Sequence, residues 1–199
     1  MRESAADAGW HAPLFRSLVE DLRGGGRRVV LDLGTARSAN LGLFRHFRVR
    51  LYVADVGGSL LDLSSLSDPE RLRRRAEALL PRTGPEPVDL VLCWDLLNYL
   101  GRDAMAALMT AIARRCRPGA LAHGFIVSSR PRMPRDPGAF DVLADDRIRR
   151  VGPTEPERPA PRYTAWDLDR CMPDYVVDRS VLLQDGRQEY LMRLRTPPR

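Results

Sequence analysis

Three aspartates stand where short apolar runs end, and their spacing suits the binding of a nucleotide-like ligand. Asp32 closes the run "VVLD" just before Gly34, Asp55 closes "RLYVAD", and Asp95 follows "VDLVLCW". Asp55 comes about 20 residues after Gly34, the separation that brings an acid to a ribose in dinucleotide-binding folds. A carboxylate in that position can accept hydrogen bonds from both ribose hydroxyls. We therefore predict a ligand site at these strand ends.

Two of these acids also have plain structural roles open to them. Asp55 could cap the turn before Gly57, and Asp32 could form a turn by hydrogen bonding within its own loop. Gly34 favours the ligand interpretation, because glycine lets a ligand approach the backbone closely. The turn after Asp32 would also place backbone N–H groups and the start of a helix beside an anionic group.

The elements that must position these acids follow from the apolar periodicity. Residues 14–23 have apolar side chains at helical spacing, and the glycines at 24–26 end that helix. Residues 27–34 and 48–56 are typical of strands buried on both faces. A helix is expected between them from Asn40, a favourable N-cap. The pattern predicts a βαβ unit with a right-handed crossover.

The same alternation continues along the chain. A helix is expected from Asp68 as N-cap. Residues 88–100 open as a third buried strand that turns at Asp95, residues 101–119 form a long helix with a Pro-Gly terminator, and residues 120–129 supply another strand. The order predicts an open, mostly parallel sheet with helices on both faces, which is a three-layer αβα, Rossmann-like α/β fold.

The last third of the chain has a different character. Seven prolines within residues 130–162 argue against a long regular element and predict a proline- and arginine-rich loop or lid, with a short helix at 139–148. Thr164 is expected to begin a helix with a capping box. The Asp185-Gly186 pair between two alternating runs predicts an antiparallel C-terminal hairpin that completes the sheet.

In this order, "VVLDLG", "YVADV", "VDLVLCWDLLNYL", "RPGALAHGFIV" and the closing hairpin resemble a class I S-adenosylmethionine-dependent methyltransferase over about residues 27–195. The family's first motif is an acid followed by three alternating glycines. Asp32 and Gly34 match it, whereas Ala36 and Ser38 replace the second and third glycines, so the motif is degenerate. If position 36 needs a positive φ, alanine there costs on the order of 1–2 kcal/mol.

The resemblance implies S-adenosylmethionine as the cofactor and gives the strand-end residues their expected roles. Asp55 matches the family's ribose-binding acid. The family's third strand would fall on "SLLDLSSL" at 59–66, which makes Asp62 the candidate for the contact with adenine. The expected cofactor-binding residues are Asp32, Gly34, Ala36, Ser38, Asp55, Val56, Asp62 and Trp94.

Polar residues after the third buried strand form the expected catalytic region, with Asp95, Asn98 and Tyr99 as its candidates. Tyr99 could instead be a packed helix residue, and Trp94 suits the core as well as it suits stacking on a flat ligand. We predict in-line methyl transfer, in which holding the acceptor near the methyl group supplies much of the acceleration. The acceptor is expected to be a small molecule. The alternative is a non-catalytic methyltransferase-like protein that binds or regulates a partner.

Composition sets the outer bounds of these expectations. The 199 residues suit one methyltransferase-like domain at 1–199, which begins with a helical segment at 1–26. All 32 basic residues are arginine, which is typical of GC-rich coding, while the net charge of +6 leaves nucleic acid open as a partner. The sequence does not specify an oligomeric state.

No membrane or metal chemistry is expected from the sequence. No apolar run reaches the roughly 20 residues that a membrane span needs, and the N-terminus does not resemble a signal peptide, so we expect a cytoplasmic protein. The cysteines at 93, 116 and 171 and the three histidines do not have the spacing of a zinc site.

Overall fold

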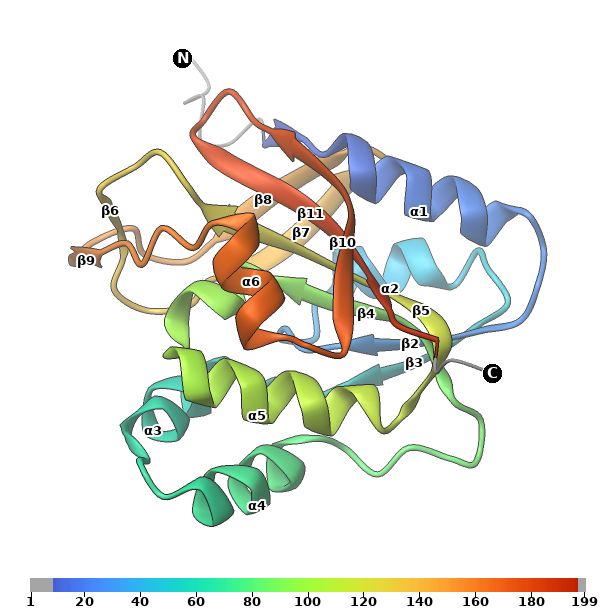
Figure 1. The fold of residues 1–199 in the computed structure, drawn as a ribbon. Coiled ribbons are helices and arrows are strands. Elements are labelled where there is room, and N and C mark those ends of the chain that lie inside the picture. Colours follow the sequence, from blue (N-terminus) through green and yellow to red (C-terminus); the bar gives the residue numbers. More distant parts are fainter. Residues whose placement is uncertain (1–8, 197–199) are drawn as a thin grey trace, which may run out of the picture.

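The computed structural model describes residues 9–196 and has helices on both faces of a six-stranded sheet (Figure 1). The parallel strands are β2 (Arg28–Asp32), β3 (Val49–Val53), β4 (Val88–Trp94) and β5 (Cys116–Val127). The antiparallel strands are β10 (Tyr175–Leu182) and β11 (Arg187–Leu194). The strand order is β10-β11-β5-β4-β2-β3. The predicted αβα fold with an antiparallel C-terminal hairpin is confirmed.

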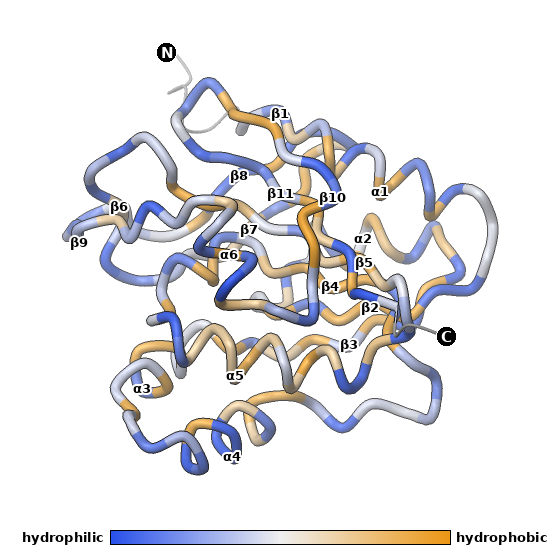
Figure 2. The backbone as a smooth tube through the Cα atoms, in the orientation of Figure 1, coloured by the Kyte–Doolittle hydropathy of each residue, from blue (hydrophilic) through white to orange (hydrophobic). Residues whose placement is uncertain are grey.

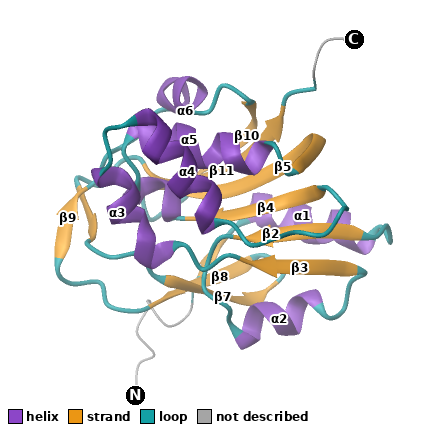
Figure 3. Cartoon of the chain, turned by 90° about the horizontal axis from the view of Figure 1, so that it is seen from below, coloured by secondary structure: helices purple, strands orange, loops and turns teal. Residues whose placement is uncertain are grey.

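Two apolar cores, one on each face of the sheet, hold the layers together. Helices cover both faces of the sheet (Figure 3). Successive strand residues face opposite sides, so Val29 and Leu31 enter one core and Val30 enters the other. The first core packs under α3 (Leu60–Ser65), α4 (Pro69–Leu79), α5 (Arg102–Ala113) and α6 (Ala165–Cys171). Figure 2 shows the hydrophilic residues of α4 at the outside of this layer.

The second core packs under α1 (Pro13–Arg23), α2 (Ser38–Phe44) and a small second sheet. That sheet contains β1 (Trp10–His11), β8 (Arg147–Val151) and β7 (Ala139–Ala144), in this order. A separate pair joins β6 (Arg132–Pro134) to β9 (Glu157–Pro159). Residues 1–8 of the predicted N-terminal helical segment lie outside the described residues.

The start of α1 is capped from a distant strand. Its N-cap residue, Ala12, has no side chain that can accept a hydrogen bond. The carboxylate of Glu189, on β11, accepts hydrogen bonds from the backbone N–H groups of Leu14 at 3.0 Å and Phe15 at 2.8 Å. His123, on β5, contacts the same carboxylate at 2.8 Å. A fully buried acid therefore satisfies the free N–H groups of the helix and ties α1 to the sheet.

In the first half of the chain, one predicted boundary shifts and one predicted element is wrong. Helix α2 begins at Ser38, not Asn40, and Asn40 is a buried residue inside the helix. Residues 59–66 do not form the family's third strand, because Leu60 and Leu63 lie on one helical face and pack into the first core as part of α3. β3 is consequently an edge strand whose residues are only partly buried.

Two predicted boundaries in the second half also change. Helix α5 ends at Ala113, and β5 already pairs with β4 at Cys116, so the Pro-Gly pair lies within an irregular strand start. Residues 139–148 form most of the β7–β8 hairpin instead of a short helix. The reason is that the side chains alternate in direction: Phe140 and Val142 enter the second core with Ile148, and Asp141 between them pairs with Arg37.

Two findings bear on membranes and metals. Within residues 9–196, no helix has the length and apolar character needed to cross a membrane. In the same part of the chain, no group of three or more His, Cys, Asp or Glu side chains is placed to hold a metal ion.

Candidate functional site

The turns that follow β2, β3 and β4 meet at the carboxyl edge of the sheet, where open α/β sheets bind ligands. The backbone N–H of Val56 donates to the Leu33 carbonyl at 3.0 Å, and that of Leu33 donates to the Leu92 carbonyl at 3.0 Å. Acids predicted from three separate sequence segments therefore share one edge of the molecule.

Asp55 is the acid at this edge that is best placed to meet a ligand. Its side chain is exposed at the end of β3, and its backbone has a φ of 47°, in the left-handed region that non-glycine residues seldom adopt. The hydroxyl of Thr35 donates to Asp55 Oδ1 at 2.8 Å and joins the first two turns. Thr35 was missed in the sequence, where only the glycine positions of its loop attracted notice. Val56 is buried and offers only its backbone.

Asp32 is turned inward and is occupied by the protein itself. Its Oδ1 accepts hydrogen bonds from the Gly34 backbone N–H at 2.8 Å and from Trp94 Nε1 at 2.5 Å. Burial raises the pKa of Asp32 to about 6, against the opposing effect of these two hydrogen bonds. This carboxylate organises the first turn and holds the Trp94 indole.

The inner side of Gly34 is filled by Trp94. A Cβ atom at position 34 would lie 2.7 Å from Cδ1 and Nε1 of the indole, so glycine is required there for the tryptophan to fit. Trp94 is 1% exposed, has a φ of 50°, and stacks on Phe140 with ring centroids 5.3 Å apart. The indole belongs to the second core, and Phe140 is its partner from the β7–β8 hairpin.

The two positions where glycines are replaced are both exposed. Positive φ angles among the described non-glycine residues occur at Asp55, Trp94 and Arg162, so Ala36 does not carry the strain considered from the sequence. Ser38 is the first residue of α2, and its hydroxyl does not act as the N-cap. Ala36 and Ser38 therefore border the outer side of the first turn.

The β7–β8 hairpin is attached to the first turn and α2. Asp141 pairs with Arg37 Nε at 2.8 Å, and this contact is the main reason why the pKa of Asp141 is lowered. Asn40 donates from Nδ2 to the Phe140 carbonyl at 2.9 Å and accepts from the Val142 N–H at 3.0 Å. The proline-rich segment thus covers this edge of the sheet through β-structure.

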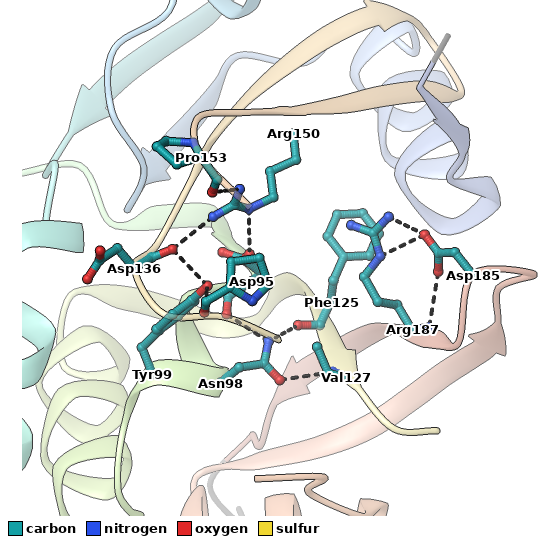
Figure 4. A network of polar contacts seen from close by, with 11 residues as sticks. Asp95, Asn98, Tyr99, Phe125, Val127, Asp136, Arg150, Pro153, Asp185 and Arg187 are labelled. Atoms are coloured by element: carbon teal, nitrogen blue, oxygen red, sulfur yellow. Dashed lines mark hydrogen bonds and ion pairs between the residues drawn. The ribbon is translucent and has the colours of Figure 1, made fainter. Parts of the chain in front are cut away.

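Asn98, in the short 3-10 helix at Leu96–Tyr99, fixes the turn after β4 (Figure 4). Its Nδ2 donates to the carbonyls of Asp95 at 2.7 Å and Phe125 at 2.8 Å, and its Oδ1 accepts from the Val127 N–H at 2.9 Å. The amide of Asn98 thus joins the ends of β4 and β5.

Tyr99 is buried, and its hydroxyl contacts the proline-rich segment. It lies 3.0 Å from the carbonyl oxygen of Asp136 and 3.2 Å from that of Pro134, so it can donate its one proton to either. Burial is the largest cause of the raised pKa of this phenol. Tyr99 therefore stays neutral and holds the segment against the turn.

Asp95 is the candidate catalytic residue with an unused hydrogen-bonding atom. Its side chain is 9% exposed, and Oδ1 has no hydrogen-bond partner. Arg150 Nε, on β8, lies 3.7 Å from Oδ2. Burial raises the pKa of Asp95 to about 6, while the charges of Arg150 and Arg187 act in the opposite direction. Arg150 and Arg187 were missed in the sequence because their elements are remote from Asp95.

Asp62 does not lie in a turn that follows a strand of the sheet. It is exposed in the first turn of α3 instead of following a sheet strand. The sheet ends at β3, so the strand that would place an acid beside adenine is not among the described elements.

The residues fit the ribose of S-adenosylmethionine better than they fit its methionine part. Exposed Asp55 with Thr35 offers oxygen atoms suited to the ribose hydroxyls. The inner side of Gly34 does not leave room for a ligand, because the Trp94 indole is there. A methionine group would have to lie on the outer side of the turn, along Ala36 and Ser38.

Comparisons with known proteins agree with this fold. No protein-family profile matches the chain, and neither does any curated protein sequence. A solved S-adenosylmethionine-dependent methyltransferase from Clostridium acetobutylicum is similar, with a TM-score of 0.54 at 13% identity over 92% of this chain and 91% of that one. The N-methyltransferase NodS from Bradyrhizobium japonicum, solved with S-adenosyl-L-homocysteine, gives 0.52 at 13% identity over 98% and 90%.

A third solved structure contains both a cofactor product and an acceptor. It is the 1,6-didemethyltoxoflavin-N1-methyltransferase from Burkholderia thailandensis, with bound 1,6-didemethyltoxoflavin and S-adenosylhomocysteine. Its TM-score is 0.51 at 17% identity, over 92% of this chain and 77% of that one. At these identities the likenesses establish the fold.

Proposed function

We propose that this chain, which has the fold of the class I S-adenosylmethionine-dependent methyltransferases, binds S-adenosylmethionine and methylates a small-molecule acceptor. The observation that carries the proposal is Asp55, an exposed acid held in a strained backbone conformation at the end of β3. Strain of this kind concentrates at functional sites. Ribose binding would use the acceptor positions of that carboxylate that the Thr35 hydrogen bond leaves open.

The chain's own residues would divide the work among the three turns. Asp55 and Thr35 would hold the ribose hydroxyls, and the outer side of the turn at Ala36 and Ser38 would border the methionine part. Exposed Asp62 is the acid on α3 that remains for adenine. The bound cofactor would supply an electrophilic methyl group. Asp95, at the end of β4, would lie on the acceptor side.

A small acceptor is favoured by the cover over this edge. The β7–β8 hairpin and the residues before it contact the turns after β2 and β4 through Asp141, Phe140 and Arg150. A polymer would have to displace these contacts. The solved methyltransferase from Burkholderia thailandensis, which holds 1,6-didemethyltoxoflavin, gives a precedent for a small acceptor on this fold.

Thermal-shift titration with S-adenosylmethionine and S-adenosylhomocysteine tests the proposal. A ligand that binds only the native state at 100 times its Kd stabilises that state by about 2.7 kcal/mol, so the Tm should rise. Asp55→Ala should remove the rise, while Glu70→Ala, an exposed acid on α4, should keep it. An unchanged affinity in Asp55→Ala would refute the ribose assignment.

A second candidate function is supported by the indole beside Gly34. Trp94 takes up the inner side of the turn, as expected if a methyltransferase-like protein had given up its cofactor and become a binding or regulatory protein. The same titration separates the two candidates. No Tm shift of the wild-type protein at millimolar ligand would reject the enzyme and leave this second candidate.

A further inference from the structure

An acid and an arginine at the end of β4 face each other with one unused hydrogen-bonding atom each (Figure 4). The side chain of Asp95 is 9% exposed and that of Arg150 is 12% exposed. Asp95 Oδ1 and Arg150 Nε both lack a hydrogen-bond partner. The closest approach recorded between the two groups, Arg150 Nε to Asp95 Oδ2, is 3.7 Å, which exceeds the length of a hydrogen bond. Buried polar atoms without partners are rare and costly, so this pair requires an explanation.

The gap between the two side chains is maintained by the surrounding structure. Arg150 donates from Nη1 to the Pro153 carbonyl and from Nη2 to the Asp136 carbonyl, each at 2.8 Å. It also packs against Gly138, where a Cβ atom would lie 2.5 Å from Arg150 Nε. The backbone of Asp95 is fixed, because Asn98 Nδ2 donates to its main-chain carbonyl. The guanidinium therefore cannot move toward the carboxylate without breaking two hydrogen bonds.

The two atoms without partners determine which chemical group could hydrogen-bond to both of them. Asp95 Oδ1 requires a hydrogen-bond donor, and Arg150 Nε requires an acceptor. The charges of the two side chains cancel, and the neighbouring Arg187 is already paired with Asp185. A cation would be opposed by Arg150 and an anion by Asp95. A neutral group that both donates and accepts, which a hydroxyl does with a single oxygen atom, satisfies both.

Aromatic rings lie beside Arg187, whose charge acts on Asp95. The ring of Phe125 lies beside the guanidinium of Arg187, with 6.0 Å between the ring centroid and Cζ (Figure 4). Trp10 packs edge-to-face against Phe125 at 5.8 Å, and Tyr99 borders the pair through its shared contact with Asp136. An aromatic ring that carries the hydroxyl would find contacts of its own kind here.

We propose that Asp95 and Arg150 together bind one hydroxyl group of the methyl acceptor, and that the acceptor is a neutral phenol. The hydroxyl donates to Asp95 Oδ1 and accepts from Arg150 Nε. This inference rests on the proposed function only where it identifies the ligand as the acceptor. The binding of a phenol itself depends on the described side chains alone.

Three probes of nearly equal size test this proposal. Phenol can donate and accept, anisole can only accept, and toluene can do neither. Ligand-observed NMR titration of the wild-type protein should give a Kd for phenol at least tenfold lower than those for anisole and toluene. Equal binding of phenol and toluene, or no binding of phenol, would overturn the proposal.

A double variant separates recognition from stability. Asp95→Leu combined with Arg150→Met replaces both polar partners by apolar groups, which is tolerated far better than removing one partner. This variant also loses the two hydrogen bonds that Arg150 donates to the carbonyls of Pro153 and Asp136, so its Tm should fall below that of the wild-type protein. It should remain folded and should bind phenol and toluene equally. Arg158→Met, which removes a nearby arginine that stacks on Tyr99, should keep the preference for phenol. A double variant that retains the preference would show that the hydroxyl binds elsewhere.

A crystal structure of the wild-type protein soaked in phenol locates the hydroxyl. The expected result is its oxygen atom within about 3.2 Å of both Asp95 Oδ1 and Arg150 Nε. A water molecule that keeps this position in the presence of phenol would overturn the proposal. Titration with S-adenosylmethionine is independent of these experiments. A protein that prefers phenol without binding that cofactor would lose the proposed function and keep the hydroxyl site.

Discussion

Two buried carboxylates on neighbouring parts of the sheet differ in how completely the fold satisfies them. Glu189, on β11, is fully buried and receives the N–H groups of Leu14 and Phe15 and a contact from His123. Asp95, after β4, is 7% exposed and has an oxygen atom without a partner. The same chemical group is structural where the fold completes its hydrogen bonds. Where the fold leaves a carboxylate oxygen without a hydrogen-bond partner, that oxygen is available to a ligand.

The largest effect on the free energy of unfolding is expected at Glu189, the acid whose hydrogen bonds the fold completes. Glu189→Leu would leave two helix N–H groups and His123 without their buried partner, and losing one member of such a group costs about 3–5 kcal/mol. Urea denaturation should show that decrease in the free energy of unfolding. Asp178→Leu, an exposed acid on β10, should change it by less than about 0.5 kcal/mol. A loss below 1 kcal/mol in Glu189→Leu would show that α1 does not depend on this cap.

The second largest effect on the free energy of unfolding is expected at Asp95, the acid with an oxygen atom that has no partner. This effect depends on pH. Burial raises the pKa of Asp95 from 3.8 to about 6, so the folded state holds this proton more tightly than the unfolded chain does. Its contribution to stability is therefore present in full below pH 3.8 and is lost as pH rises through 6. When Asp95 is fully ionised, above pH 6, this shift in its pKa corresponds to a loss of about 3 kcal/mol in the free energy of unfolding.

Asp95→Asn makes that pH dependence measurable. The amide does not ionise, so the variant should be more stable than the wild-type protein at pH 8, and the two should converge toward pH 4. The free energy of unfolding from urea titrations across this range checks the sign. Asp178→Asn serves as the exposed control. A wild-type protein that gains relative stability with rising pH would contradict the assignment.

The parts of the molecule that sequence patterns predicted well depend on local order. Short apolar runs closed by turn signals place β2, β3 and β4, and the acids at their ends follow from that placement. The closing hairpin follows from Asp185 and Gly186 at its turn. These features require only neighbours in the sequence, which is why a single chain is enough to predict them.

The parts that were predicted poorly depend on partners that are far apart in the sequence. Glu189 caps a helix through Leu14, 175 residues earlier, and Arg150 faces an acid from another element. Residues 139–148 were predicted as a short helix between flanking prolines, whereas Phe140 and Val142 on β7 face the second core and Asp141 between them faces Arg37. The Trp94 indole, which fills the space beside Gly34, stacks on Phe140 from the distant β7–β8 hairpin. No local pattern indicates these contacts.

The smallest effect is expected at a third buried carboxylate, Asp141, which two arginines satisfy. Arg37 reaches it at 2.8 Å and Arg149 at 3.1 Å, and their side chains are 35% and 32% exposed. Arg37→Gln should lower the free energy of unfolding by only about 0.5–1 kcal/mol, because partly exposed ion pairs are weak and Arg149 remains. Salt at 1 M should shrink this loss, since it screens exposed charges. A loss above 2 kcal/mol that salt does not change would mean that the hairpin, like α1, depends on a buried and satisfied acid.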